Sequence, residues 1–407
     1  MKLLHTSDWH LGKRLNDFSR FEEQQAVLNE ICDIAEMEKV NAVLVAGDLF
    51  DTFNPAVEAV DLFYKTLKRL SDNGKRAVIC IAGNHDSPER IEAPDPLARE
   101  CGIIFSGLPE TEVAAFSLET GLKVLKSDKG FLELELPGCS YPLRLLMTPY
   151  TSELRLRKYL GTENAEEEMR NLLQKRWKEL ADGCCDSLGV NILLAHLYMM
   201  KEDGPVTEEP EDERPILRPG GTEAVFTSCV PHGLHYAAIG HLHRRQTVET
   251  SPCPVIYSGS PLSYSFSEAD QDKFIMIIEA EPGCDAKVRE VKLLSGKRLL
   301  RKRFEMTDEA VEWLLVNQDS LVEITMVSDT FLTAEDRKRL LDAHNGIIII
   351  PEFKNAGQDS EKAGLQVDLT RGISDLFFDF FKKEKGQEPG EDIMSLFNEI
   401  ISREDKV

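Results

Sequence analysis

The feature that most constrains the fold is a series of short apolar runs, each about as long as one buried β-strand. Six of them recur along the chain: LLHTSD, NAVLVAGD, AVICIAGN, LRLLMTP, VNILLAH and YAAIGH. Continuous apolar runs of this length are typical of strands that are covered on both faces, and helical patterns lie between them. The sequence therefore predicts an α/β domain built around buried strands.

Most of these runs end in side chains that can bind a metal. The polar residues at or just beyond the ends are Asp8, His10, Asp48, Asn84, His85, His196, His241 and His243. Open α/β sheets bind ligands at the carboxyl ends of their strands, so we expect these side chains to share one rim. Clustered carboxylates and imidazoles are electrostatically poor without cations, whereas two divalent metals bridged by one carboxylate would satisfy them.

Two of these histidines, His241 and His243, are only one residue apart in the segment AAIGHLH. In a continuing strand the two rings would lie side by side on one face. We expect each ring to face a different metal of one dinuclear site. A single histidine at a strand end is more often a hydrogen-bonded surface group, but five such strand ends in one chain favour a site. Structural or surface roles are expected for His5, His232, His235 and His344.

Composition narrows the class of protein. The net charge of −23 argues against a freestanding nucleic-acid binder, so a role on DNA would need bound cations or a basic partner. Nine cysteines without a CxxC pair favour reduced thiols in the cytoplasm over a zinc–cysteine site. We find no segment with the apolar length of a signal peptide or membrane span, and expect a soluble cytoplasmic protein.

Four parts are predicted along the chain: a catalytic domain (1–283), a small α+β capping or DNA-binding domain (284–353), a linker (354–372) and a helical partner-binding element (373–407). In the first part, one helix is expected over about 19–38 with Ser19 and Glu22 as a capping box. A second helix is expected with Asn54 as its N-cap, Pro55 as its first residue and Gly74 as its stop. Hairpins are expected within 109–142, and a charged helix over about 152–181.

The C-terminal segment is rich in apolar side chains. Its last helix places one apolar stripe on Ile393, Leu396, Phe397, Ile400 and Ile401. The helices could pack on the protein's own core, or they could bind a groove on a partner. The polar linker that precedes them favours a partner.

The polar motifs occur in the order DWH, GDLFD, GNHD, AH and GHLH, and this series resembles the calcineurin-like metallophosphoesterases over roughly residues 1–280. The resemblance implies two packed β-sheets flanked by helices. A closer resemblance, to the bacterial branch of the double-strand-break repair nucleases, is carried by TSDWHLG, AGDLFD, AGNHDSPER and YSGSPLSYSFSEADQDK. The last of these stretches lies outside the metal motifs.

The resemblance also implies a set of metal ligands. One ion would be held by Asp8, His10, Asp48 and His243. The other would be held by Asp48, Asn84, His196 and His241, which makes Asp48 the bridge. Mixed nitrogen and oxygen ligands suit octahedral Mn²⁺ without excluding Fe or Zn, and the resemblance selects two manganese ions.

His85 follows the ligand Asn84 but is not assigned to a metal. We expect it to stabilise the transition state or to protonate the leaving oxygen, the alternative being that it only supports the ligands. Archaeal and eukaryotic relatives usually carry histidine where this chain has Asp51, and a carboxylate cannot be a cationic phosphate contact. Phosphate contacts could instead come from three basic residues, although exposed cations are usually just solvated: Lys13, Arg14 and Arg20.

The function implied by the resemblance is a Mn²⁺-dependent DNA nuclease of repair and recombination. It would act as a homodimer with a coiled-coil ATPase, as a 3′-to-5′ exonuclease on duplex ends and an endonuclease on single strands and hairpins. The alternative is a phosphomonoesterase or cyclic-nucleotide phosphodiesterase on the same metal core, which has no need of a second domain. A non-catalytic scaffold is disfavoured because every ligand position is intact.

Overall fold

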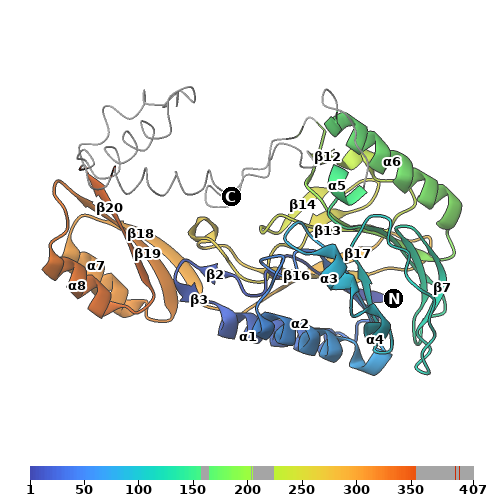
Figure 1. Cartoon of the computed structure of the whole chain (residues 1–407), viewed down its shortest axis with the longest axis horizontal. Coiled ribbons are helices and arrows are strands. Elements are labelled where there is room, and N and C mark those ends of the chain that lie inside the picture. Colours follow the sequence, from blue (N-terminus) through green and yellow to red (C-terminus); the bar gives the residue numbers. More distant parts are fainter. Residues whose placement is uncertain (157–164, 203, 205–223, 354–389, 391–393, 395–407) are drawn as a thin grey trace. The chain divides into compact units, whose positions relative to one another are not determined.

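The computed structural model describes residues 1–156, 165–202, 204, 224–353, 390 and 394 (Figure 1). Residues 1–326 together with 333–350 form one compact unit. The predicted linker and the C-terminal element fall almost wholly outside the described residues. No helix within the described ranges is long and apolar enough to cross a membrane.

Two large sheets form the centre of this unit. The first has six strands in the order β17 (Lys287–Lys292), β16 (Phe274–Glu279), β1 (Lys2–Thr6), β4 (Ala42–Ala46), β5 (Ala77–Ile81) and β6 (Ile103–Ser106). The second has seven: β14 (Gln246–Glu249), β15 (Val255–Tyr257), β13 (Tyr236–Gly240), β10 (Val190–His196), β9 (Leu143–Thr148), β8 (Phe131–Glu135) and β7 (Lys123–Asp128). All six apolar runs of the sequence form strands at the middle of these sheets, as predicted.

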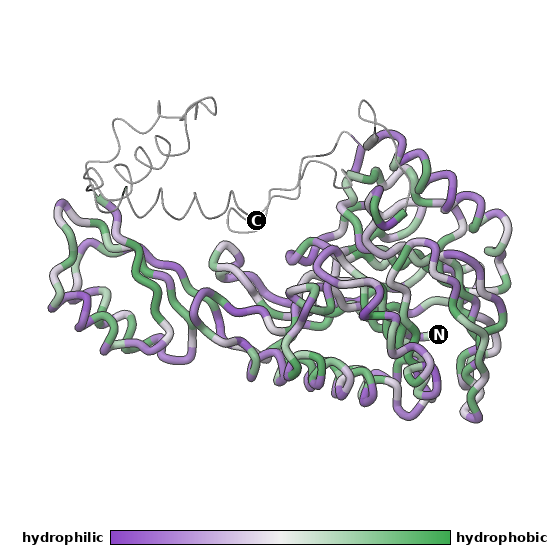
Figure 2. Tube along the Cα trace, in the orientation of Figure 1, coloured by the Kyte–Doolittle hydropathy of each residue, from purple (hydrophilic) through white to green (hydrophobic). Residues whose placement is uncertain are grey.

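The helices cover the outer faces of the two sheets. Helices α1 (Phe21–Met37) and α2 (Val57–Leu70) pack side by side on the six-stranded sheet, and α6 (Ala165–Cys184) packs on the seven-stranded sheet (Figure 1). Between the sheets lies a third apolar layer that includes Leu44, Ile79 and Leu194. Figure 2 shows the consequence, with largely hydrophobic central strands and helices that alternate between hydrophobic and hydrophilic residues. The predicted sandwich of two sheets flanked by helices is confirmed.

Shorter elements complete this part of the chain. They are β2 (Arg14–Leu15), β3 (Phe18–Ser19), α3 (Pro88–Glu92), α4 (Asp95–Arg99), α5 (Glu153–Leu156), β11 (Met199–Met200), β12 (Val225–Phe226), and the 3₁₀ turns Asp72–Gly74, Thr227–Cys229 and Phe266–Glu268. The expected hairpin within 109–142 is β7–β8, and the charged segment contains α5 and α6.

The small α+β part contains β18 (Arg298–Phe304), α7 (Thr307–Val316), β19 (Ser320–Ser328), α8 (Ala334–Ala343) and β20 (Ile347–Phe353). Its three strands form one sheet in the order β18–β19–β20. Leu299 and Leu321 of this sheet belong to a small apolar cluster with Leu15 and Phe266. Strand β17, which the predicted division placed with this part, is hydrogen-bonded to β16 in the six-stranded sheet.

Two predicted helix starts were wrong. Helix α1 begins at Phe21 after Arg20, and the Ser19 hydroxyl accepts a hydrogen bond only from the backbone N–H of Phe21, so the capping box with Glu22 does not form. Ser19 is instead paired in the short strand β3. Helix α2 begins at Val57 after Ala56, so Asn54 is not its N-cap, and it ends at Leu70 rather than at Gly74. At the first of these starts, strand pairing of Ser19 replaces the local capping signal.

The two sheets come into close contact where β4 and β13 end, and Gly240 makes this contact sterically possible. A Cβ on Gly240 would lie 1.8 Å from the carbonyl oxygen of Ala46. We predict that Gly240→Ala lowers the free energy of unfolding by about 1–3 kcal/mol or more, because the sheets must move apart. Chemical denaturation of the purified variant measures this change.

The matched control is Gly183→Ala, since Gly183 is exposed in α6 and a Cβ there meets nothing within 4 Å. It should be neutral or stabilising by up to about 1 kcal/mol, as for any glycine replaced in a helix. Equal denaturation midpoints for the wild type and both variants would contradict the steric account.

Candidate metal centre

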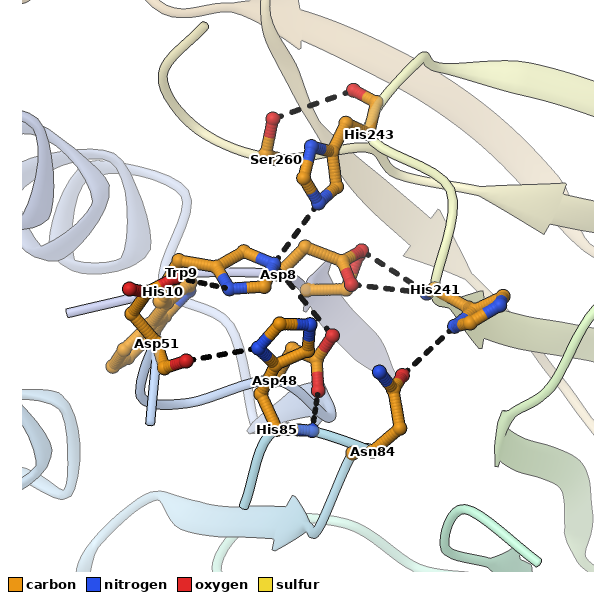
Figure 3. A network of polar contacts seen from close by, with 12 residues as sticks. Asp8, Trp9, His10, Asp48, Asp51, Asn84, His85, His241, His243 and Ser260 are labelled. Atoms are coloured by element: carbon orange, nitrogen blue, oxygen red, sulfur yellow. Dashed lines mark hydrogen bonds and ion pairs between the residues drawn. The ribbon is translucent and has the colours of Figure 1, made fainter. Parts of the chain in front are cut away.

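The strand ends of both sheets bring the predicted polar residues to one place (Figure 3). From the six-stranded sheet, the loops after β1, β4 and β5 contribute Asp8, His10, Asp48, Asn84 and His85. From the seven-stranded sheet, the end of β10 and the loop after β13 contribute His196, His241 and His243. All eight of these side chains meet in one cluster of contacts.

The backbone around this cluster is unusual. Asp8, His10, Asp48 and His241 all have positive φ, with values of 53°, 44°, 48° and 115°. Non-glycine residues rarely adopt this region, and such strain persists where surrounding structure over-determines it. Part of that surrounding structure is a pair of hydrogen bonds, from Asp8 N to Gly47 O (3.0 Å) and from His10 N to Asp48 O (3.0 Å).

The first group of candidate ligands is Asp8, His10 and His243, which are all buried and offer ligand atoms within 4.8 Å of one another. The Nε2 atoms of His10 and His243 lie only 2.9 Å apart. The Asp8 carboxylate accepts hydrogen bonds from the Ser7 hydroxyl (2.5 Å) and from the backbone N–H of His241 (3.0 Å). These three residues belong to the set predicted for one metal.

The second group consists of Asn84, His196 and His241. The Asn84 Oδ1 atom lies 3.0 Å from His196 Nε2 and 3.0 Å from His241 Nδ1, and these two nitrogens are 3.3 Å apart. His196 donates its Nδ1–H to the carbonyl oxygen of Ala46 (2.8 Å), because a carbonyl can only accept. This bond fixes the ring so that Nε2 faces the group.

Asp48 lies between the two groups. Its Oδ2 atom is 3.6 Å from His10 Nε2 in the first group and 3.4 Å from His196 Nε2 in the second. Its other oxygen, Oδ1, accepts a hydrogen bond from the backbone N–H of His85 (2.9 Å). One carboxylate oxygen that reaches ligands of both groups is the arrangement expected of a bridge.

The electrostatics of the cluster fit divalent cations. Burial lowers the pKa of His10 and lowers that of His241 to about 3, which leaves the neutral imidazoles that metals bind. Burial raises the pKa of Asp8 to about 6. Although burial opposes it, the charge of Asp48 raises the pKa of His196 to about 9. The buried carboxylates therefore need positive charge nearby, and a bound cation would supply it.

The arrangement of His241 and His243 differs from the sequence expectation in one respect. Strand β13 ends at Gly240 and His241 has a φ of 115°, so the two histidines do not continue the strand. Their rings turn to different groups, with His241 on Asn84 and His243 on His10 (Figure 3). The rings are therefore divided between the groups by a bend rather than presented side by side.

His85 lies beside the first group without belonging to either predicted ligand set. Its ring meets that of His10 edge to face, with centroids 4.9 Å apart. Its Nδ1–H donates to the backbone oxygen of Asp51 (2.8 Å), which leaves Nε2 as the ring atom available for other contacts. The Asp51 carboxylate lies 3.6 Å from the ammonium nitrogen of Lys13 and 3.7 Å from Nδ1 of the His10 ring.

The other histidines have the structural or surface roles expected of them. His5 is buried against the Tyr236 hydroxyl, His235 accepts the backbone N–H of Asn191, and His344 contacts the backbone of Asn317 and Gly346. His232 is exposed.

One of the three suggested phosphate contacts is wrong. Arg20 is only 1% exposed, and its guanidinium group binds Glu23 and the carbonyl oxygen of Ser263. It therefore cannot reach DNA. Arg14 is exposed, and Lys13 lies at the rim of the site near Asp51.

Residues that hold the ligands in place were missed by sequence reasoning. The Asp86 carboxylate accepts backbone N–H groups from Gly83 (2.8 Å), Leu49 (3.0 Å) and Phe50 (3.0 Å), and so ties the loop after β4 to the loop after β5. Ser258 lies 2.8 Å from the Ser7 hydroxyl that binds Asp8. In the sequence, these supporting residues are marked only by the aspartate that ends GNHD and by the stretch 257–273. No local pattern shows that either one supports a ligand.

Known proteins resemble this chain over most of its length. The family model for calcineurin-like phosphoesterases matches residues 1–245. The SbcD subunit of nuclease SbcCD from Bacillus subtilis is 36% identical over 99% of this chain and 98% of its own, and that of Rhodobacter capsulatus is 34% identical over 70% and 67%. A putative 5′-nucleotidase from Staphylococcus aureus aligns at 13% identity with a TM-score of 0.38, covering 84% of this chain and 57% of that one, too weakly to support an argument.

The chain belongs to the calcineurin-like phosphoesterase family and, within it, to the family of SbcD nuclease subunits. The resemblance inferred from the sequence motifs is confirmed. Family membership implies divalent metal ions, and the two groups of clustered ligands meet that requirement with side chains of this chain.

The position of Asp48 leads to a prediction about metal content. Asp48→Ala should lose both ions, since its carboxylate reaches both groups. By contrast, His241→Ala should weaken only the ion near Asn84 and leave the other in place. Inductively coupled plasma mass spectrometry after dialysis against Mn²⁺ measures the ions retained by each variant. Two full equivalents in Asp48→Ala would show that this carboxylate does not bridge.

Proposed function

We propose that this chain is the Mn²⁺-dependent nuclease subunit of an SbcCD-type complex and hydrolyses DNA phosphodiesters in repair and recombination. The observation that carries the proposal is the pair of ligand groups joined through Asp48, the first buried and the second partly buried. Relatives that carry the name of the SbcCD nuclease support the substrate class. Histidine, asparagine and carboxylate ligands suit Mn²⁺.

The proposed ligands form two sets, one for each metal ion. One ion would be held by Asp8, His10, Asp48 and His243, and the other by Asp48, Asn84, His196 and His241. The chemistry that two such ions supply when bound is neutralisation of phosphoryl charge and acidification of the attacking water. The hydrogen bonds of Asp8, Asp48 and His196 to the backbone hold these ligands before substrate arrives.

His85 would act on the leaving oxygen. Its backbone N–H and its ring Nδ1–H are both engaged, by Asp48 Oδ1 and by Asp51 O, which fixes the direction of the ring. With a proton on both ring nitrogens, Nε2–H would give its proton to the departing oxygen, or donate a hydrogen bond to it in the transition state; after the transfer the ring is neutral and Nδ1–H stays on Asp51 O. Asp51 contributes to this through its backbone, so the change from histidine at that position leaves the orientation of His85 intact.

A digestion assay tests the function. Labelled duplex, hairpin and single-stranded DNA are incubated with the full chain and Mn²⁺, with and without an SbcC-type ATPase and ATP. We expect endonuclease activity on single strands and hairpins, and 3′-to-5′ exonuclease activity on duplex ends. Hydrolysis of phosphomonoesters or cyclic nucleotides with no cleavage of any DNA would favour the alternative function instead.

The role of His85 gives a second prediction for the same assay. His85→Ala should keep both Mn²⁺ ions but lose roughly 10²–10⁴-fold in DNA cleavage rate, the usual contribution of a proton-transferring side chain. The comparison variant is His10→Ala, whose ring belongs to the first ligand group and whose metal content should fall. Loss of metal in His85→Ala, or cleavage near the wild-type rate, would rule out the role.

The proposed partner is an SbcC-type coiled-coil ATPase, and the proposed contact is the apolar C-terminal element beyond the linker, which lies outside the described residues. Deleting residues 361–407 should preserve Mn²⁺-dependent cleavage of single strands while abolishing SbcC binding and ATP-dependent duplex digestion. Co-purification with SbcC measures the binding directly.

Two point variants sharpen the test of the partner-binding element. Leu396→Asp places a charge on the apolar stripe and should weaken SbcC binding, whereas Ser395→Asp places the same charge beside the stripe and should not. Full stoichiometric binding of SbcC by the deleted chain would refute the assignment.

We also propose a homodimer that works in the cytoplasm. Phe53 and Val57, next to the start of α2, are 58% and 80% exposed, and burial of such side chains favours association. All nine cysteines are free thiols, which suits a reducing compartment. Sedimentation of the full chain tests the dimer.

A further inference from the structure

The segment 258–273, from Ser258 to Lys273, contacts the first ligand group and the residues next to it. Ser258 reaches the Ser7 hydroxyl that holds Asp8, and the Tyr264 hydroxyl donates to the carbonyl oxygen of Trp9, between Asp8 and His10. The Tyr264 ring also lies edge to face with His10, at 5.6 Å between centroids. The segment therefore contacts the rings of His10 and His243 directly and reaches Asp8 through Ser7.

Within this segment lies a buried ion pair. Glu268 is 1% exposed and Lys273 is 9% exposed, and the Lys273 ammonium donates to Glu268 Oε2. The other oxygen, Oε1, accepts the backbone N–H groups of Tyr264 (2.9 Å) and Ser265 (3.2 Å). The carboxylate is thereby held rigidly inside the segment.

Both members of the pair face His243. Glu268 Oε1 lies 3.6 Å from the Nδ1 atom of His243, on the side of the ring opposite the Nε2 atom that faces His10. Lys273 Nζ donates to the backbone carbonyl oxygen of His243 (3.1 Å), which also accepts the backbone N–H of Ser260 (3.1 Å). The ring and the backbone of His243 are thus contacted by the same pair.

Stability alone is a poor reason for this arrangement. Removing two charges from water costs about as much free energy as their attraction returns, so a buried ion pair adds little to folding. A carboxylate behind a metal-binding imidazole, in contrast, fixes the orientation of the ring and makes its far nitrogen a stronger ligand. The second group has a different support, because His196 is held by the carbonyl of Ala46.

We propose that Glu268 and Lys273 are positioning residues that hold His243 for the first metal ion only. The inference rests on the proposed function, since it assigns His243 to a metal. It also gives the stretch 257–273 a physical role, because two residues of this stretch would hold His243, a ligand of one ion, in place. The other ion would be held by ligands from the loop after β5, the end of β10 and the loop after β13, together with the shared Asp48.

The experiment is calorimetric titration of the metal-free full chain with Mn²⁺. Wild type should bind two ions, whereas Glu268→Gln and Lys273→Met should each bind one ion unchanged and the other about 10–100-fold more weakly. The matched control is Glu323→Gln, which breaks the pair that Glu323, 9% exposed, forms with Arg301 in the small sheet. It should leave both affinities unchanged.

A spectroscopic readout distinguishes positioning from general destabilisation. At a Mn²⁺ concentration that fills both wild-type sites, electron paramagnetic resonance should show a coupled pair in wild type and an isolated ion in Glu268→Gln and Lys273→Met. Melting temperatures are recorded in parallel, and Lys273→Met carries the test if Glu268→Gln does not fold.

Three outcomes would overturn the inference. Wild-type affinities at both sites in the two variants would show that the pair does not position His243. Equal weakening of both ions together with a lower melting temperature would indicate a purely structural role. A wild-type chain that binds fewer than two Mn²⁺ ions would contradict the proposed function itself, and the inference would fail with it.

Discussion

The site depends on the close approach of two sheets at the point where their central strands end. The carbonyl oxygen of Ala46, at the end of β4, accepts the Nδ1–H of His196 from the opposite sheet, and Gly240 passes directly over it. Side chains larger than hydrogen at Gly240 would separate the sheets, and ligands from β4 and β13 could no longer meet. Four residues with positive φ place their side chains at this junction, and the packed sheets around them maintain the strained backbone: Asp8, His10, Asp48 and His241.

Much of this arrangement could be predicted because strand ends obey a general rule. Parallel strands in one sheet end at one edge, so DWH, GD and GNH gather at an edge of the six-stranded sheet, and the histidines that follow β10 and β13 gather at an edge of the seven-stranded sheet. Only the packing of the two sheets brings these two edges together. Local signals failed where tertiary contacts decided the outcome. Arg20 looks like a surface cation in the sequence but is buried on Glu23, and Ser19 pairs in a short strand instead of capping a helix. The bend at His241 is likewise a property of the junction between sheets.

Supporting residues were the hardest to foresee. Glu268 and Lys273 lie more than twenty residues after the last ligand and reach His243 only because the chain folds back over the first ligand group. The overall charge of −23 opposes contact with DNA, so the site must concentrate positive charge where phosphate binds. Divalent cations held by the carboxylates of the two ligand groups would provide this charge at the site.

The central claim is that two metal ions share one carboxylate between the sheets. A crystal structure of the Mn²⁺-loaded protein with anomalous diffraction data at the manganese edge tests it most directly. The account predicts two peaks roughly 3.5–4 Å apart, one among Asp8, His10 and His243, the other among Asn84, His196 and His241, with Asp48 touching both. A single peak, or a peak among His10, Asp51 and His85, where a third set of ligand atoms converges, would contradict it.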